Sequence, residues 1–301
     1  MQLKTTSAVP GLPLLAPLPV IDSHVHFWDP AVLDYPWLRN APGLQRAFHP
    51  DDLPGLSSER LGGVIAMEAA CRVSQRPEEV TFLEALAATE PRIVGIVAAV
   101  DLLQRDGRPQ SLALLREQPR VVGVRHGIRG HARGFSLQQE FVRGVREVGE
   151  QQLTFDLRIT ADQLLEASAL VRQCPDTVFV LDHCGSPAIR NNGFEPWATN
   201  LARLAESENV SCKLSGLFTE ARPEQCVDDG LFRYARHAMS CFGGTRLMYG
   251  SDWPVVTSAV GEPVWRTFTD RFTADWTRSA REAFYGGNAA RIYRPAVEVP
   301  S

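Results

Sequence analysis

The hydrophobic and polar positions of the chain form eight short apolar runs that are rich in β-branched residues. The runs span residues 20–27, 63–69, 93–100, 121–127, 153–159, 177–184, 209–216 and 246–253. Within them the apolar residues are nearly continuous and do not alternate with polar ones. This pattern is typical of strands that are buried on both faces of a parallel sheet.

Segments with helical periodicity separate these runs. Residues 76–90 have a proline and two glutamates near their start, where proline is tolerated and the helix dipole favours acids. Residues 160–174 begin with Thr160, a good N-cap, and residues 194–208 and 273–293 are amphipathic too. Strands that alternate with helices in this way predict a single TIM (β/α)8 barrel. A doubly wound open sheet is the alternative, but no G-x-G-x-x-G turn follows any run.

Length and composition suit one large α/β domain. The chain has 301 residues, of which 44% are hydrophobic and 22% charged, as in ordinary globular proteins. We assign residues 20–301 to the barrel and residues 1–19 to a poorly ordered or surface-draped arm. The net charge of -4 offers no basic excess for nucleic acid or a membrane surface, so the expected partner is a small molecule.

Cysteine usage and hydropathy favour a cytoplasmic location. The six cysteines are scattered and form no C-x-x-C pair, which fits a reducing compartment. Prolines interrupt the mildly apolar N-terminus, and it lacks the cleavage site of a signal peptide. No run approaches the roughly 18 apolar residues of a membrane span. Oligomeric state is not encoded in these patterns.

Polar side chains gather at the ends of the predicted strands. In a (β/α)8 barrel the chemistry lies at the carboxyl ends of the strands, so we expect these side chains to meet at one face. They are His24, His26, Glu68, Asp101, Arg125, His126, Asp156, Arg158, Asp182, His183, Lys213 and Asp252.

The first strand carries a histidine pair, His24 and His26. Residues two apart point to the same side of a strand, so the two imidazoles lie together. Paired imidazoles serve as metal ligands or as donors to a developing oxyanion. The alternative is an edge strand with two solvated histidines.

Five motifs together resemble the amidohydrolase superfamily, in its amidohydrolase-2 branch. They are "DSHVHFWDP", "GVRH", "FVLDHCGSP", "VSCKLSGL" and "MYGSDWPV", and they occur in this order across nearly the whole domain. Within that branch they are most similar to the group of sugar lactonases and 2-pyrone-4,6-dicarboxylate lactonases. The resemblance implies a distorted (β/α)8 barrel and a metal-dependent hydrolase of carbohydrate metabolism.

Carried over by position, the resemblance implies that His24, His26, His183 and Asp252 are both the catalytic residues and the metal ligands. Asp252 would act as general base; its alternative role is a helix N-cap. The fourth and fifth strands lack the bridging lysine or glutamate and the histidine of binuclear relatives. We therefore expect at most one divalent ion, most simply Zn²⁺. Metal-free catalysis, in which the same groups polarise a carbonyl by hydrogen bonds, stays open.

The remaining polar and aromatic residues of the barrel mouth are candidates for substrate binding. They are Arg125, His126, Arg158, Glu68, Lys213, Trp28 and Trp253, with Trp37 as a further aromatic. Guanidinium groups suit a carboxylate or several hydroxyls, although a salt-bridge network is the structural alternative. Lys213 is expected to pair with Asp156 or Asp182, and Cys184 to lie in the core.

Together with these residues, the resemblance implies a hydrolase that opens a small lactone, most simply an L-fuconolactone- or L-rhamnonolactone-type aldonolactone. Many relatives have a glutamine where this chain has Glu68, and G-K-P where it has Ser186 between Gly185 and Pro187. These differences leave the identity of the lactone open. The alternatives are a 2-pyrone-4,6-dicarboxylate-type lactonase, a metal-dependent non-oxidative decarboxylase and a non-catalytic binding barrel.

Overall fold

In the computed structural model, which describes residues 19–54, 61–227 and 229–295, eight parallel strands follow one another around a barrel in chain order. The strands are β1 (Val20–His26), β2 (Leu61–Met67), β3 (Ile93–Ala99), β4 (Val121–Arg125), β5 (Thr154–Leu157), β6 (Val178–Leu181), β7 (Val210–Leu214) and β8 (Leu247–Tyr249). Nearly every strand residue is buried. The sequence-based prediction of a TIM barrel is confirmed.

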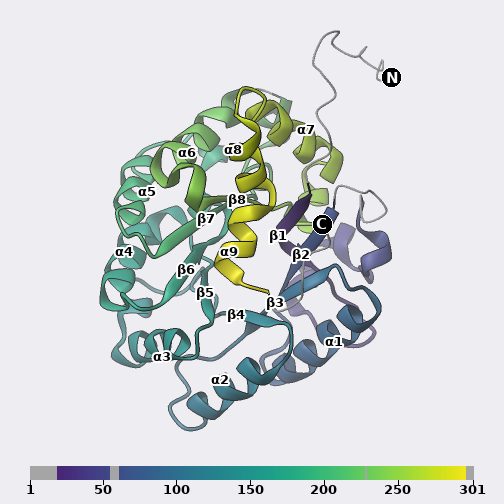
Figure 1. The fold of residues 1–301 in the computed structure, drawn as a ribbon, viewed down its shortest axis with the longest axis vertical. Coiled ribbons are helices and arrows are strands. Elements are labelled where there is room, and N and C mark those ends of the chain that lie inside the picture. Colours follow the sequence, from purple (N-terminus) through teal and green to yellow (C-terminus); the bar gives the residue numbers. More distant parts are fainter. Residues whose placement is uncertain (1–18, 55–60, 228, 296–301) are drawn as a thin grey trace.

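Helices surround the barrel (Figure 1), and one α-helix separates each pair of successive strands from β2 to β8, whereas the described residues between β1 and β2 form only 3-10 turns. They are α1 (Arg76–Thr89), α2 (Arg108–Glu117), α3 (Gln139–Glu150), α4 (Leu164–Gln173), α5 (Trp197–Ala205), α6 (Phe232–Arg246), α7 (Glu262–Phe272), α8 (Arg278–Glu282) and α9 (Asn288–Tyr293). No helix in the described ranges is both long and apolar enough to span a membrane. All six cysteines are free thiols, and Cys184 lies in the core as predicted.

The barrel closes between β8 and β1 through the segment that follows β8. Within the described residues, a single isolated β-bridge joins β1 to this segment, between Val25 and Trp253. The amide of Asp252 donates to the carbonyl of His24 (2.9 Å), and the amide of His26 donates to the carbonyl of Trp253 (2.7 Å). The carboxylate of Asp22 also accepts a hydrogen bond from the amide of Ser251 at 2.8 Å. Closure therefore fixes Asp252 beside His24.

Several predicted elements differ from the structure at their ends. Asp182 and His183 lie in a 3-10 turn (Asp182–Gly185) after β6, and Asp252 lies beyond the end of β8. The cause is the backbone, since His183 (φ 53°) and Asp252 (φ 60°) adopt left-handed conformations that a strand cannot continue through.

The helical predictions also need one correction. The predicted helix at residues 273–293 begins only at Arg278, and a π-helical turn (Ala283–Gly287) joins α8 to α9. Thr160 does act as a cap, in a capping box with Gln163 that opens the 3-10 turn before α4. The domain prediction stays untested, and residues 1–18 of the predicted arm lie outside the described residues.

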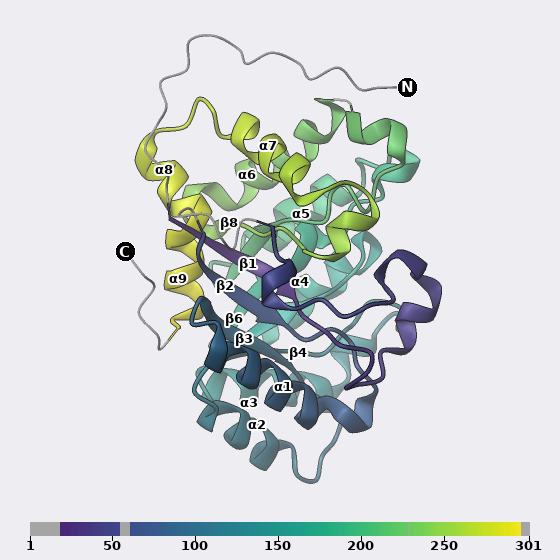
Figure 2. The same cartoon turned by 90° about the vertical axis from the view of Figure 1, so that its right-hand side faces the viewer.

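The C-terminal helix α9 seals one end of the barrel, opposite the segment that follows β1 (Figure 2). Ala289, Ile292 and Tyr293 of α9 join an apolar cluster inside the barrel with residues near the starts of strands, among them Ile21 and Val94. The interior of the barrel is apolar at this end and polar at the other. The predicted chemistry therefore lies at the carboxyl ends of the strands.

Glu79 of α1 gives stability a predicted dependence on pH. Its side chain is 1% exposed and accepts from the amide of Ala69 at 3.0 Å. Burial, and then the charge of Glu68, raise its pKa from the ordinary 4.5 to about 8. The pKa of Glu79 is therefore higher in the folded protein than in the unfolded chain. Its contribution to the free energy of unfolding is complete below pH 4.5 and is lost as the pH rises through about 8.

We expect this group alone to lower the free energy of unfolding of the wild type by about 4 kcal/mol between roughly pH 5 and pH 9. Glu79→Gln should lack this contribution, whereas Glu78→Gln, on the exposed side of the same turn, should keep it. Urea unfolding at the two pH values measures the difference. An equal loss in wild type and Glu79→Gln would refute the assignment.

Candidate active site

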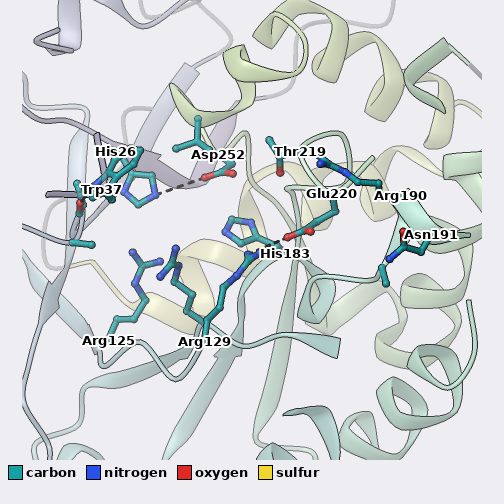
Figure 3. A pocket seen from close by; sticks show the side chains of 15 residues that line it. His26, Trp37, Arg125, Arg129, His183, Arg190, Asn191, Thr219, Glu220 and Asp252 are labelled. Atoms are coloured by element: carbon teal, nitrogen blue, oxygen red, sulfur yellow. Dashed lines mark hydrogen bonds and ion pairs between the residues drawn. The ribbon is translucent and has the colours of Figure 1, made fainter. Parts of the chain in front are cut away.

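A cavity of about 680 Å³ opens at the carboxyl ends of the strands, within the roughly 300–1,000 Å³ range of small-molecule sites. Figure 3 shows His26, His183 and Asp252 converging on it, with Arg125 and Arg129 approaching from one side. The residues that line it are His26, Trp37, Ala69, Ala70, Arg125, Arg129, Arg158, His183, Ala188, Arg190, Asn191, Thr219, Glu220, Asp252 and Val255.

His24, His26 and Asp252 form a compact triangle, in which His26 and Asp252 line the floor of the cavity and the fully buried His24 lies outside the lining. The Nε2 atoms of the two histidines are 3.1 Å apart, and each lies 3.6 Å from Oδ1 of Asp252. Adjacent ligand atoms of a tetrahedral zinc ion are about 3.3 Å apart, given bond lengths near 2.0–2.1 Å. The triangle therefore has the size of a single-metal site, and the predicted role of these three residues as metal ligands stays a prediction.

The protonation of the two imidazoles suits metal binding. Burial, and then Lys213, hold the pKa of His24 well below its usual range. Burial, and then Arg125, lower the pKa of His26 to about 3. Both rings are therefore neutral near pH 7, which is the form that binds a metal.

The far side of His24 offers a second indication that the residues fit a metal ion. Oδ1 of Asp182 is buried and lies 3.2 Å from Nδ1 of His24, with the ammonium of Lys213 on its other side at 3.0 Å. A metal on Nε2 would leave the ring proton on Nδ1, facing this oxygen. Such carboxylate–histidine contacts orient metal-binding imidazoles.

His183 faces the cavity from the turn after β6 but belongs to a second group. It clusters with His24 and Asp182, whereas Asp252 clusters with His24 and His26. Its Nδ1 lies 2.8 Å from the hydroxyl of Ser215, and burial lowers its pKa to about 3 despite the nearby charge of Asp182. A side chain at Gly216 (φ 67°) would come within 2.8 Å of the ring, so that glycine keeps room for His183.

Asp252 is buried, with only 4% of its surface exposed. Burial, and then the charge of Asp182, raise its pKa well above the usual range. A cation bound in the triangle would oppose both effects and favour the carboxylate. Water reaching the cavity floor would meet Asp252 beside two neutral imidazoles.

Lys213 lies beneath this floor and has no exposed surface. Its ammonium is 2.6 Å from Asp156 Oδ2, 3.0 Å from Asp182 Oδ1 and 3.1 Å from His24 Nδ1. The pairing expected from the sequence therefore involves both aspartates. Lys213 does not line the cavity, so its position corrects the expectation that it contacts substrate.

Arg125 is held by two acids at the side of the cavity. Its Nε lies 2.5 Å from Glu68 Oε1 and its Nη1 lies 3.1 Å from Asp182 Oδ2. The second oxygen of Glu68 accepts from the amide of Ala70 at 2.7 Å. Burial alone would raise the pKa of Glu68, but the charge of Arg125 brings it below the usual value. Arg125 lines the cavity, whereas Glu68 only supports it.

Three other residues expected at the substrate also lie outside the lining. His126 accepts from the amide of Leu102 at 3.1 Å and packs among aromatic rings. Trp28 and Trp253 are almost fully buried and pack around Phe48. Trp37 is the tryptophan that reaches the cavity. The buried aromatic rings therefore support the wall of the site and do not offer a platform for a sugar ring.

The outer wall comes from loops that no motif singled out. Arg129, Arg190, Asn191, Thr219 and Glu220 lie after β4, β6 and β7 and line the cavity. Arg129 pairs with Glu220 at 3.1 Å. Their place in loops after strands was the only signal in the sequence, and it does not distinguish them from other loop residues.

Arg158 lines the cavity with its guanidinium unpaired. No side-chain hydrogen bond or ion pair joins it to any residue in the described ranges. Burial, and then the like charge of Arg125, lower its pKa. A guanidinium stays charged in proteins, so Arg158 presents an unsatisfied positive charge to whatever occupies the cavity.

Comparison with known proteins identifies the family. The sequence model of the amidohydrolase family, Amidohydro_2, matches residues 21–294. The chain belongs to the amidohydrolase family. This amidohydrolase is 34% identical over 297 residues to an L-fucono-1,5-lactonase from Burkholderia multivorans, a match that covers 91% of this chain and 95% of the relative. It is 31% identical over 287 residues to an L-fucono-1,5-lactonase from Burkholderia ambifaria, with the same coverage of 91% and 95%.

A solved structure with bound zinc has the same fold. The crystal structure of an amidohydrolase from Burkholderia multivorans with bound zinc superimposes with a TM-score of 0.83. The two chains are 32% identical, and the match covers 92% of this amidohydrolase and 99% of the other chain. A member of the family thus binds zinc, and the triangle of His24, His26 and Asp252 is a possible metal site here.

We expect this amidohydrolase, purified without chelators, to hold no more than one zinc equivalent per chain. The triangle supplies three ligands for one ion, and the guanidinium groups beside it would repel a second cation. His26→Ala should weaken zinc binding by about 10-fold or more, whereas Trp37→Phe should not. Elemental analysis and competition with a chromogenic chelator measure both. Two tightly held equivalents would contradict the single-metal arrangement.

Proposed function

We propose that this amidohydrolase opens a small lactone ring to the hydroxy acid. The observation that carries the proposal is the triangle of His24, His26 and Asp252, two of which (His26 and Asp252) line the floor of a cavity of about 680 Å³. It places a carboxylate for taking a proton from water next to neutral imidazoles, in a space of the size that small molecules occupy. The similarity to two L-fucono-1,5-lactonases supports the same reaction.

In the proposed reaction, water attacks the lactone carbonyl while Asp252 accepts its proton. Asp252 then delivers that proton to the ring oxygen as the acyl–oxygen bond breaks. The product is a hydroxy acid, which ionises and releases a proton into solution. No oxidant or second substrate is needed.

The developing negative charge on the carbonyl oxygen needs donors in the cavity. When the hydroxyl of Ser215 donates to Nδ1 of His183, the neutral ring carries its proton on Nε2, where it can donate to substrate. We propose that His24, His26 and Asp252 hold one zinc ion. When bound, such an ion lowers the pKa of water and polarises a carbonyl.

The polar wall favours a lactone with several hydrogen-bonding groups. Arg125, Arg129, Arg190, Asn191 and Thr219 offer donors around the cavity, as an aldonolactone of the L-fuconolactone or L-rhamnonolactone type requires. The unpaired guanidinium of Arg158 favours a second candidate, a lactone that carries a carboxylate, such as a pyrone dicarboxylate. A bidentate arginine–carboxylate pair would satisfy that charge.

Asp252→Asn should lower kcat for lactone hydrolysis about 10²-fold or more, because the amide cannot accept a proton. Proton release from aldonolactones and pyrone carboxylates, followed with a pH indicator with and without chelator, measures this loss. Near-normal turnover in Asp252→Asn would rule out its role as base. Release of CO₂ from an acid substrate, with no lactone opened, would favour the decarboxylase alternative.

Arg158→Met separates the two substrate candidates. If Arg158 binds a substrate carboxylate, kcat/KM for a carboxylated lactone should fall about 10- to 100-fold, the loss expected for a charge-assisted pair. A neutral aldonolactone of the same ring size should change little. Arg172→Met, which removes an exposed charge on α4, is the control. An equal loss of kcat for both lactones would assign Arg158 to the oxyanion instead.

A further inference from the structure

Tyr293 reaches the active-site network from the opposite end of the barrel. It is the last residue of α9, which lies across the barrel end in Figures 1 and 2. Its side chain is 3% exposed and packs in the apolar cluster with residues from several strands. The hydroxyl group, however, points to a charged partner.

That partner is Asp156 of β5. The hydroxyl of Tyr293 donates to Oδ2 of Asp156 at 2.7 Å, and the ammonium of Lys213 donates to the same oxygen at 2.6 Å. Lys213 also pairs with Oδ1 of Asp182 at 3.0 Å, and this oxygen lies 3.2 Å from Nδ1 of His24. Five side chains thus connect the terminal helix to the first imidazole of the candidate metal site.

The chain of contacts is rigid because each member is buried. Asp156, Lys213 and His24 have no exposed surface, so water cannot replace a lost contact. The ammonium also lies 5.4 Å from the centre of the Tyr293 ring. The other oxygen of Asp156 has a longer contact, 3.3 Å from the hydroxyl of Thr154. Tyr293 and Lys213 therefore determine where Oδ2 lies.

We propose that Tyr293 is a positioning residue for the metal site. It holds Asp156, and Asp156 holds Lys213. Lys213 in turn holds Asp182, which accepts from Nδ1 of His24, so that Nε2 faces His26 and Asp252. Tyr293 touches neither the cavity nor the reacting atoms. The effect on turnover rests on the proposed lactonase function, whereas the effect on His24 does not.

Tyr293→Phe tests this, because it removes one hydroxyl and keeps the ring in the barrel. Tyr285→Phe is the matched control, since Tyr285 is 2% exposed, lies in the same C-terminal segment and donates to Oδ1 of Asp270 at 2.9 Å. Both variants lose one hydrogen bond to an aspartate, so both should lower Tm by about 1–4 °C.

Only Tyr293→Phe should change the site. We expect shifted ¹⁵N resonances of the His24 ring, Kd for Zn²⁺ raised about 10-fold, and kcat lowered about 10-fold with KM within a factor of about 2. Tyr285→Phe should match wild type in all three. In the Asp156→Asn background, Tyr293→Phe should add little, because the two changes break one chain of contacts.

One outcome would overturn the proposal: Tyr293→Phe has a lower Tm, but its His24 resonances, zinc affinity and kcat equal those of the wild type. Tyr293 would then only seal the barrel. If the wild type opens no lactone, the lactonase function fails, and the resonances and zinc affinity still decide the role of Tyr293. Should Tyr293→Phe not fold, Asp156→Asn must shift the His24 resonances; unchanged resonances would overturn the proposal.

Discussion

The ammonium of Lys213 lies inside the barrel with no exposed surface, between Asp156 and Asp182. An unpaired charge at this depth would be very costly, and breaking a buried pair costs on the order of 3–5 kcal/mol. The three residues come from β5, the turn after β6, and β7. The strands on this side of the barrel must therefore keep their register for the charges to stay paired.

The same charges set the geometry of the reaction site. His24 on β1 meets Lys213 and Asp182 through Nδ1 and turns Nε2 toward His26 and Asp252. The backbone bond from Asp252 to His24 closes the barrel and completes the triangle. Folding and assembly of the site are thus one event, because the contacts that join β8 to β1 also bring Asp252 to the imidazoles.

The arginines that line the cavity wall differ in their ion pairing. Arg125 is neutralised by Glu68 and Asp182, and Arg129 is paired with Glu220. These pairs hold the wall in place and leave little charge for a ligand. Arg158 differs because it lines the cavity and no acidic side chain of the described residues pairs with it. Under the proposed function, the floor would carry out the hydrolysis, while Arg158 and the surrounding loops would select the lactone.

The sequence by itself determined the barrel, because continuous apolar runs that alternate with amphipathic segments allow few other arrangements. It also brought His24, His26 and Asp252 to one face, because strand polarity fixes where strand ends meet. Only the tertiary structure decided which polar side chains face the cavity. Periodicity reports that a side chain is buried but not what lies against it. It therefore could not distinguish the buried Lys213 from the cavity-lining Arg158, nor could it place loop residues or Tyr293 of α9, whose contacts depend on packing between elements distant in the sequence.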